Sequence, residues 1–186
     1  MQRSESKQYA PHFVFKNVVQ PPVFCSILIE FSVLHQFTRV QWLNTTLDEA
    51  WNFFSSPKNL PLITPPDLGF QVLSELPDRM YEGLFIRYSV RPLLGIPMEW
   101  VTEITKVEEG RFFVDEQRVG PYSIWHHEHH FESTDKGVRM LDRVSYVIPF
   151  GVLGDWVEPW LVKPRLEHIF AYREAQVEQR FGKAVR

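Results

Sequence analysis

Two β-strands joined by a tight turn are predicted by the sequence Phe112-Phe-Val-Asp-Glu-Gln-Arg-Val-Gly-Pro-Tyr-Ser-Ile-Trp-His-His-Glu-His-His-Phe131. The turn is expected at Gly120-Pro121, since neither residue suits the middle of a strand. Strand side chains alternate between faces, so one face of the second strand presents Trp125, His127, His129 and Phe131. The other face presents His126, Glu128 and His130. Because the first set has aromatic residues at both ends, we expect that face to be the inner one.

The alternation with a period of two continues on both sides of this hairpin. Strands are predicted over residues 70–75, 84–91, 99–107, 111–117, 122–132 and 138–148, with breaks that contain proline or glycine. An earlier strand is predicted over residues 32–42. Successive strands are joined by short connections, which favours an antiparallel meander.

Helices are predicted on either side of this group of strands. Thr46-Leu-Asp-Glu49 matches a capping box, in which the threonine hydroxyl and the glutamate carboxylate satisfy free backbone N–H groups. The helix that follows is expected to end before Pro57, and a second short helix to cover residues 58–63. Near the C-terminus, apolar residues recur at helical spacing: Leu166, Ile169, Phe170, Val177 and Phe181.

The C-terminal helix is expected to begin at Asp155, with Glu158 three residues on, and to be kinked or to start a second time at Pro164. The predicted order is a strand, two short helices, six more strands and one long helix. We therefore predict an α+β fold, in which a curved antiparallel sheet of about seven strands wraps around the C-terminal helix. Space left between sheet and helix would form an apolar pocket.

The length of 186 residues suits one domain with a sizeable core. We assign that domain to residues 32–183 and predict that residues 1–31 form an N-terminal extension, poorly ordered or loosely attached. The apolar run at residues 23–34 is short and interrupted by Glu30, so no membrane span is predicted. No small-residue cleavage site follows it, which disfavours a signal peptide.

The formal net charge is −3 and no basic cluster stands out, which disfavours nucleic acid as a partner. Cys25 is the only cysteine, so neither an internal disulfide nor a zinc ribbon is available. We therefore expect a cytoplasmic protein, either a monomer or a homodimer.

Several short groups of residues match a known pattern: Leu47-Asp-Glu-Ala-Trp-Asn-Phe-Phe54, Asn59-Leu-Pro61, Gly95-Ile-Pro97, Asp115-Glu-Gln117, Gly120-Pro-Tyr122, Pro149-Phe-Gly151 and Phe170-Ala-Tyr-Arg173. Together with the strand that holds His127 and His129, they span about residues 37–181. This pattern resembles the START/Bet v 1-like superfamily, also called SRPBCC. It is most similar to the bacterial ligand-binding SRPBCC and polyketide cyclase/dehydrase-like branches.

The resemblance implies a helix-grip fold with a cavity for a small hydrophobic molecule, such as a lipid, polyketide, isoprenoid or aromatic metabolite. It implies no shared reaction, because its members include carriers, receptors, cyclases and oxygenase domains. It supplies neither a universal catalytic set nor a cofactor. We therefore predict ligand binding without a cofactor.

The connection at residues 134–137 sets the register of the last two predicted strands. It pairs Ser133 with Val138, so that His129 faces Asp142 and His127 faces Val144. Trp125 then faces Tyr146 and Phe131 faces Met140. A hydrogen bond between His129 and Asp142 would fix the imidazole tautomer and raise its pKa.

The predicted ligand contacts are Tyr88, Trp100, Asp115, Gln117, Trp125, His127, His129, Phe131, Asp142 and Tyr146. Polar groups that converge in an apolar pocket often orient a ligand. The alternative is a buried polar ladder that only holds the strands together. Arg173 either reaches solvent, pairs with an acid at the rim, or contacts a carboxylate of the ligand.

Three further hypotheses remain open. His129, Asp142 and His127 are candidate catalytic residues for proton transfer in a cyclase, dehydratase or isomerase, so enzymatic activity is undecided. The two histidines with an opposing carboxylate also match a two-histidine, one-carboxylate metal triad, but the resemblance supplies no metal and we predict none. The third hypothesis is a protein-interaction module that uses exposed aromatic residues.

Overall fold

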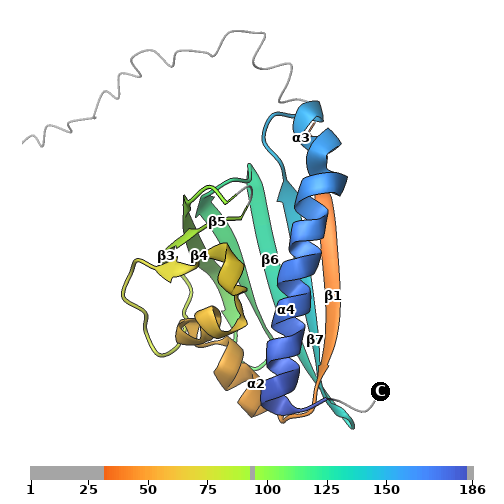
Figure 1. Cartoon of the computed structure of the whole chain (residues 1–186). Helices are drawn as coiled ribbons and strands as arrows, with labels where there is room; N and C mark the ends of the chain where they lie inside the picture. The colour runs from red at the N-terminus through yellow and green to blue at the C-terminus, as the bar shows by residue number, and fades with distance from the viewer. Residues whose placement is uncertain (1–31, 93–94, 184–186) are drawn as a thin grey trace, which may run out of the picture.

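The computed structural model describes residues 32–92 and 95–183, and the predicted extension, residues 1–31, lies outside them. Seven strands form a single antiparallel sheet in the order β1-β7-β6-β5-β4-β3-β2. Their bounds are β1 His35–Leu43, β2 Gln71–Val72, β3 Phe85–Val90, β4 Met98–Glu108, β5 Phe112–Val119, β6 Ile124–Thr134 and β7 Gly137–Val147. The long C-terminal helix lies across one face of this sheet (Figure 1). The predicted α+β class and number of strands are confirmed.

The strand predicted over residues 70–75 is the main departure, because only β2 forms there. Two residues of β2 pair with β3, and the backbone N–H of Leu73 still donates to the carbonyl of Arg87. Beyond that point the side-chain oxygen of Ser74 accepts from the backbone N–H of Arg87. The serine hydroxyl takes the place of a ladder carbonyl, which ends the pairing.

The first helix, α2 (Leu47–Phe54), begins at the predicted capping box. The Thr46 side-chain oxygen accepts from the backbone N–H of Glu49 at 3.3 Å, and the Glu49 carboxylate accepts from the backbone N–H of Thr46 at 3.4 Å. Two short 3₁₀ helices follow, η1 (Pro57–Ile63) and η2 (Pro66–Leu68). The prolines at their first turns explain this tighter geometry, since proline removes backbone donors.

The C-terminal helix runs without a break through α3 (Val152–Val157), a π-helical turn (Glu158–Val162) and α4 (Lys163–Phe181). The predicted start at Asp155 is wrong. This residue lies inside α3, and its carboxylate instead accepts from the backbone N–H of Val33 at 3.0 Å. The disturbance expected at Pro164 takes the form of the wide π-turn just before it, because proline cannot donate to the preceding turn.

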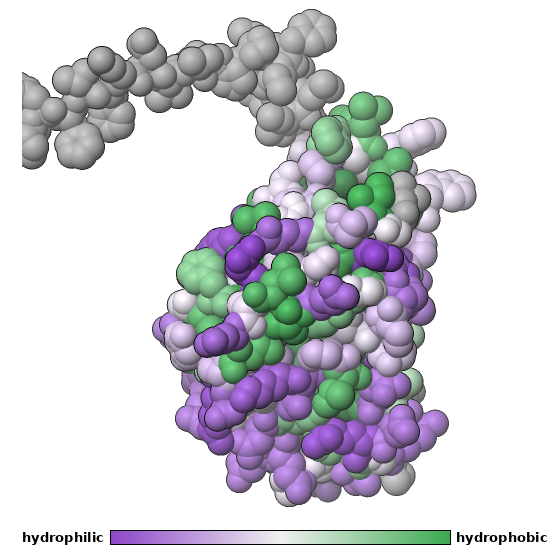
Figure 2. Space-filling view, turned by 60° about the vertical axis from the view of Figure 1, so that its left-hand side comes forward, coloured by the Kyte–Doolittle hydropathy of each residue, from purple (hydrophilic) through white to green (hydrophobic). Residues whose placement is uncertain are grey.

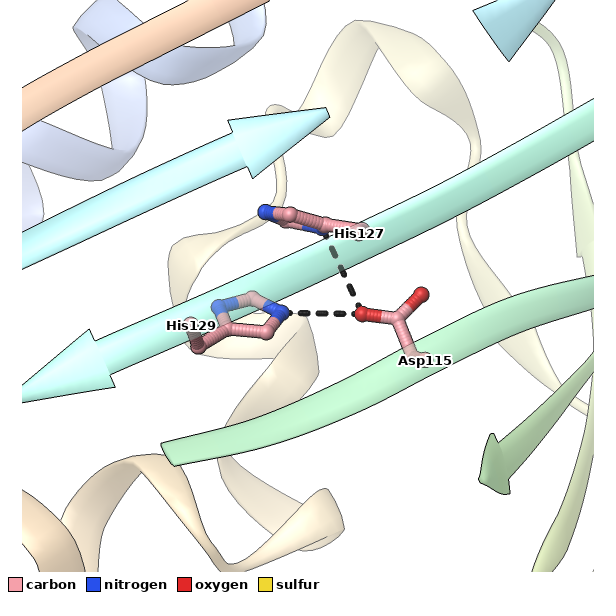
Figure 3. A group of neighbouring side chains, drawn as sticks. All are labelled: Asp115, His127 and His129. Atoms are coloured by element: carbon pink, nitrogen blue, oxygen red, sulfur yellow. Dashed lines mark hydrogen bonds and ion pairs between the residues drawn. The ribbon is translucent and has the colours of Figure 1, made fainter. Parts of the chain in front are cut away.

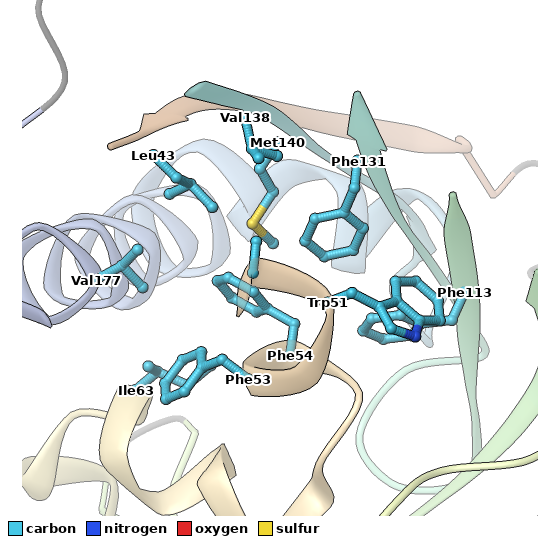
Figure 4. Close-up of a cluster of buried hydrophobic side chains, with 11 residues drawn as sticks. Leu43, Trp51, Phe53, Phe54, Ile63, Phe113, Phe131, Val138, Met140 and Val177 are labelled. Atoms are coloured by element: carbon cyan, nitrogen blue, oxygen red, sulfur yellow. The ribbon is translucent and has the colours of Figure 1, made fainter. Parts of the chain in front are cut away.

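A cluster of eleven buried hydrophobic residues fills the end of the molecule where α2, the sheet and the C-terminal part of α4 meet (Figure 4). Trp51 of α2 packs edge-on against Phe131 of β6, with ring centroids 5.6 Å apart. Val177 of α4 closes the cluster from the helix side and is fully buried. This end therefore anchors the helix, and the space nearer the middle of the sheet is left for a cavity.

The opposite end, around α3, exposes large apolar side chains. Phe150, Trp156 and Trp160 are 78%, 77% and 82% exposed. Hydrophobic residues are also visible at this end in the space-filling view (Figure 2). Within the described ranges, no helix combines the length and the apolar character needed to span a bilayer.

Candidate functional site

A cavity of about 180 Å³ lies between the sheet and α4. Strands β3 to β6 supply one wall, and η1, η2 and α4 supply the other. Its apolar lining includes Phe54, Leu68, Ile86, Phe113, Ile169 and Phe170. The lining is mostly apolar but also contains polar groups, among them Asp115, His127 and His129 on the β5–β6 side.

Six of the predicted contact residues line this cavity: Tyr88, Trp100, Asp115, Trp125, His127 and His129. The other four lie elsewhere. The Gln117 amide donates to the carbonyl of Tyr122 at 2.6 Å and so supports the β5–β6 turn. Phe131 belongs to the hydrophobic cluster beside α2. The Tyr146 hydroxyl donates to the buried carboxylate of Glu158 at 2.5 Å, and Asp142 lies behind the two histidines.

The predicted register of β6 and β7 is confirmed. His129 pairs with Asp142, His127 with Val144, and the connection pairs Ser133 with Val138. The choice of face is also correct, because His127 and His129 are 4% and 6% exposed. The outer-face histidines, by contrast, keep 37% of their side-chain surface accessible.

The two inner histidines lie between two aspartates, one on each neighbouring strand. Asp115 of β5 places its Oδ2 2.8 Å from His129 Nε2 and 3.3 Å from His127 Nδ1 (Figure 3). Asp142 of β7 places its Oδ1 3.0 Å from His127 Nε2 and 2.9 Å from His129 Nδ1. Each imidazole therefore has a carboxylate at both of its nitrogens.

The predicted hydrogen bond between His129 and Asp142 needs correction. The two atoms are close, but among the described residues His129 Nδ1 has no partner with hydrogen-bond geometry. The imidazole that is hydrogen-bonded to Asp142 is that of His127. The His129 ring stacks on Phe113 with centroids 4.1 Å apart, and this orientation directs its Nε2 to Asp115.

Burial and ion pairing act in opposite directions on this group. Burial alone raises the pKa of Asp115 and of Asp142, but the adjacent histidines outweigh it and hold both pKa values well below the ordinary range. Burial lowers the pKa of His127, whereas the two aspartates raise it, and the net result is a raised pKa. The carboxylates are thus ionised and attract positive charge into the cavity wall.

Arg173 of α4 completes the group, although sequence reasoning left its position open. Its side chain is 12% exposed, and its Nη1 lies 3.6 Å from Asp142 Oδ1. The guanidinium also lies over the Phe170 ring at 4.8 Å. Arg173 therefore points into the cavity rather than to solvent. Its spacing from Phe170 and Val177, three and four residues away, was the available sign that it shares the buried face of the helix.

Two aromatic residues on β3 and β4 provide further polar atoms in the lining. The hydroxyls of Tyr88 and Thr102 are hydrogen-bonded at 2.9 Å. Burial raises the pKa of Tyr88, so its hydroxyl stays protonated. Within the part of the chain that the structure describes, the buried Nε1 of Trp100 has no hydrogen-bond partner. A buried indole N–H without an acceptor is costly, and a ligand could supply one.

No protein-family model matches the sequence, and no curated protein matches it. Solved structures with the same fold do exist. Major latex-like protein 151 from Panax ginseng is 12% identical, with a TM-score of 0.61 over 80% of this chain and 98% of that chain. A protein from Chromobacterium violaceum is 14% identical, with a TM-score of 0.59 over 79% and 97%. A protein from Mycobacterium smegmatis is 16% identical, with a TM-score of 0.57 over 78% and 89%.

Identities this low carry information about the fold and none about a shared activity. The agreement extends over nearly the full length of each neighbour, from the sheet to the long C-terminal helix. The fold implied by the sequence resemblance is thereby confirmed. The chain has the helix-grip fold of the START/Bet v 1-like (SRPBCC) proteins.

Proposed function

We propose that this protein binds a small hydrophobic molecule, a lipid, polyketide, isoprenoid or aromatic metabolite, in the cavity between the sheet and α4. The observation that carries the proposal is a mostly apolar cavity with a few polar groups in its lining. Its volume of about 180 Å³ is close to that of engineered cavities of about 150 Å³ that bind benzene. The best fit is therefore a compact ligand, or one end of a longer molecule.

Polar groups on β4 and α4 support a ligand that is not purely hydrocarbon. Among the described residues, the Trp100 N–H and the Nε of the buried Arg173 guanidinium have no hydrogen-bond partner. Both are donors, so the complementary ligand carries an oxygen acceptor at the end that lies against β4 and α4. We also propose a reducing cytoplasm as its compartment, which the single cysteine supports.

Native mass spectrometry of gently purified protein tests this proposal by detecting small molecules that co-purify. A panel of lipids, polyketides and aromatic acids is then titrated while the fluorescence of the lining residues Trp100 and Trp125 is followed. Ile169→Trp would fill the cavity from its helix wall and is expected to abolish binding. Glu167→Trp, on the exposed side of the same helix, is the matched control and should leave binding intact. Equal binding by both variants would place the ligand elsewhere.

A second candidate function is proton transfer on the bound molecule, as in a cyclase, dehydratase or isomerase. The specific observation that favours it is the His127–Asp142 hydrogen bond of 3.0 Å on the cavity wall. A carboxylate that orients an imidazole is a common general-base arrangement. Its test is incorporation of solvent deuterium into a co-purified ligand: loss of exchange in His127→Gln, but not in the outer-face variant His126→Gln, is the expected result.

A further inference from the structure

Three donor atoms on the cavity wall converge on one point. Asp115, His127 and His129 each offer one ligand atom, and these atoms lie within 4.8 Å of one another. Asp115 Oδ2 faces His127 Nδ1 and His129 Nε2. The Asp115 oxygen lies 3.3 Å from His127 Nδ1, which equals the spacing of about 3.3 Å between tetrahedral ligands at 2.0–2.1 Å from a zinc ion, and 2.8 Å from His129 Nε2, which a bound ion would lengthen by about 0.5 Å. We infer that Asp115, His127 and His129 bind a divalent transition-metal ion.

The protons of the two imidazoles support this inference. Each ring has one nitrogen toward Asp115 and the other toward Asp142. An ionised carboxylate only accepts hydrogen bonds, and a neutral imidazole has only one N–H. A neutral imidazole in either position can therefore donate to only one of the two aspartates. A divalent cation bound to the two inner nitrogens leaves each outer nitrogen an N–H that faces Asp142.

Asp142 and Arg173 lie on the side of the two histidines that faces away from the inferred ion, where residues that orient metal ligands are usually found. Metal-bound histidines usually donate their second N–H to a carboxylate, which fixes the tautomer and strengthens the ligand. Asp142 Oδ1 lies within 3.0 Å of the outer nitrogens of both His127 and His129 and is 3% exposed. Arg173, 3.6 Å away, partly neutralises this buried carboxylate. Asp142 therefore orients His127 by a hydrogen bond and lies close enough to His129 to accept from it after a small rotation of that ring.

An ion held by these residues would have open coordination positions on the side of the cavity. Catalytic metal sites have such open positions, whereas structural sites do not. Asp115, His127 and His129 all line the cavity, whereas Asp142 does not. Two histidines and one carboxylate with open positions suit Fe²⁺ or Zn²⁺. A ligand oxygen in the cavity could then complete the coordination. The metal site is independent of the proposed hydrophobic ligand, because its three ligands come from the protein alone.

The outer face of β6 provides an internal comparison with the same residue types. There His126 contacts Glu116 at 2.9 Å and His130 contacts Glu128 at 2.6 Å. Arg143 lies 3.5 Å from that glutamate. His126 also lies 3.5 Å from Glu128, so both histidines contact that carboxylate, and both keep 37% of their side-chain surface exposed. Among the described residues, only the inner set has three donor atoms that meet the geometric requirement for one ion.

The test is metal binding by the intact chain, measured without any activity. The protein is stripped with a chelator, and Co²⁺ is titrated while its visible absorption is followed, with Zn²⁺ and anaerobic Fe²⁺ as competitors. We expect one ion per chain with nitrogen and oxygen ligands. His127→Gln, His129→Gln and Asp115→Asn should each abolish stoichiometric binding. Asp142→Asn, which keeps all three ligands, should weaken binding by about 10- to 100-fold.

Matched controls are His126→Gln and His130→Gln on the outer face, which should bind the ion as the unaltered protein does. Circular dichroism shows which variants are folded. Metal uptake by the unaltered protein tests the inference even if a variant fails to fold. Two results would overturn the inference: a stripped protein that takes up less than one-tenth of an equivalent of every ion, or binding that is lost in the outer-face variants and kept in the inner ones. The test of organic-ligand binding, which uses Ile169→Trp, is separate from this titration. Failure of one proposal can therefore be distinguished from failure of the other.

Discussion

The guanidinium of Arg173 lies 3.6 Å from the carboxylate of Asp142, which joins the C-terminal helix to the middle of β7. Both groups are largely buried, with side-chain exposures of 12% and 4%. Charges removed from water are tolerated when they are paired, and a single unpaired one is costly. This contact therefore ties the helix to the sheet at the level of the cavity.

Arg173→Met should destabilise the protein by about 3 kcal/mol, the lower end of the range for removing one partner of a buried ion pair, because the two histidines still compensate Asp142. Methionine keeps the packing volume on Phe170 but leaves Asp142 with the histidines alone. Urea unfolding followed by circular dichroism measures the change. Arg180→Met is the control, because Arg180 also lies over an aromatic ring, Phe53 at 4.6 Å, but is exposed. Equal losses in both variants would show that the Asp142 contact contributes nothing.

Trp100→Phe should weaken binding of a ligand with an oxygen acceptor by about fivefold, equivalent to a neutral hydrogen bond of about 1 kcal/mol. Phenylalanine preserves most of the ring surface and removes the N–H that has no partner among the described residues. The dissociation constant is measured by competition with a bound fluorophore. Trp156→Phe, at an exposed position, should not change it. Unchanged affinity in Trp100→Phe would mean that the indole N–H faces no ligand atom.

Without metal, stability should be greatest between about pH 4 and pH 6.5, the ordinary pKa values of aspartate and histidine. The lowered pKa values of Asp115 and Asp142 contribute stability above the lower limit, which is lost as the pH falls toward the folded-state values. The raised pKa of His127 contributes stability below the upper limit, which is lost as the pH rises through the folded-state value. Thermal unfolding of chelator-treated protein across this range gives the curve.

Two variants separate these contributions. Asp142→Asn should reduce the loss of stability on the acid side, and His127→Gln should reduce the loss on the alkaline side. A melting temperature that is equally flat across the range in all three proteins would contradict the ionisation states described for this group.

Gly137→Ala should destabilise the chain more than Gly110→Ala. Both glycines have positive φ angles, of 111° and 72°, so alanine is strained at either position by about 1–3 kcal/mol. At Gly137, however, an added Cβ would lie 2.2 Å from the backbone carbonyl oxygen of Leu43, whereas nothing lies within 4 Å at Gly110. Urea unfolding of the two variants isolates this backbone contact. An equal effect would mean that β1 moves away at little cost.

The sequence predicted those structural features that depend on residues close together in the chain. The capping box at Thr46 gave the start of α2, and the short connection before Val138 gave the register of β6 and β7. The same reasoning failed at Asp155, because a cap-like spacing also occurs inside a helix. The short β2 was missed because a serine side chain, invisible to any periodicity, ends the pairing.

Only part of the candidate site could be predicted, because some of its contacts join segments that are far apart in the sequence. The pairing of Asp115 with His127 depends on the longer β5–β6 connection, whose length does not fix a register. Irregularities between β4 and β5 shift the pairing further. Arg173 comes from a distant helix, and its reach to Asp142 depends on how that helix packs. Residue types and faces were therefore accessible, whereas contacts between distant segments were not.

Side-chain contacts hold the C-terminal helix to β1 on one side and to η2 on the other. Toward β1 the helix is fastened through Glu174, which accepts from Arg39 and, by its backbone carbonyl, from Gln41. Toward η2 it is held through Asp67, whose carboxylate contacts Arg165 at 2.6 Å and His168 at 3.2 Å at the surface. Ion pairs at the surface are weak and screened by salt, so raised ionic strength should loosen the contact between α4 and η2.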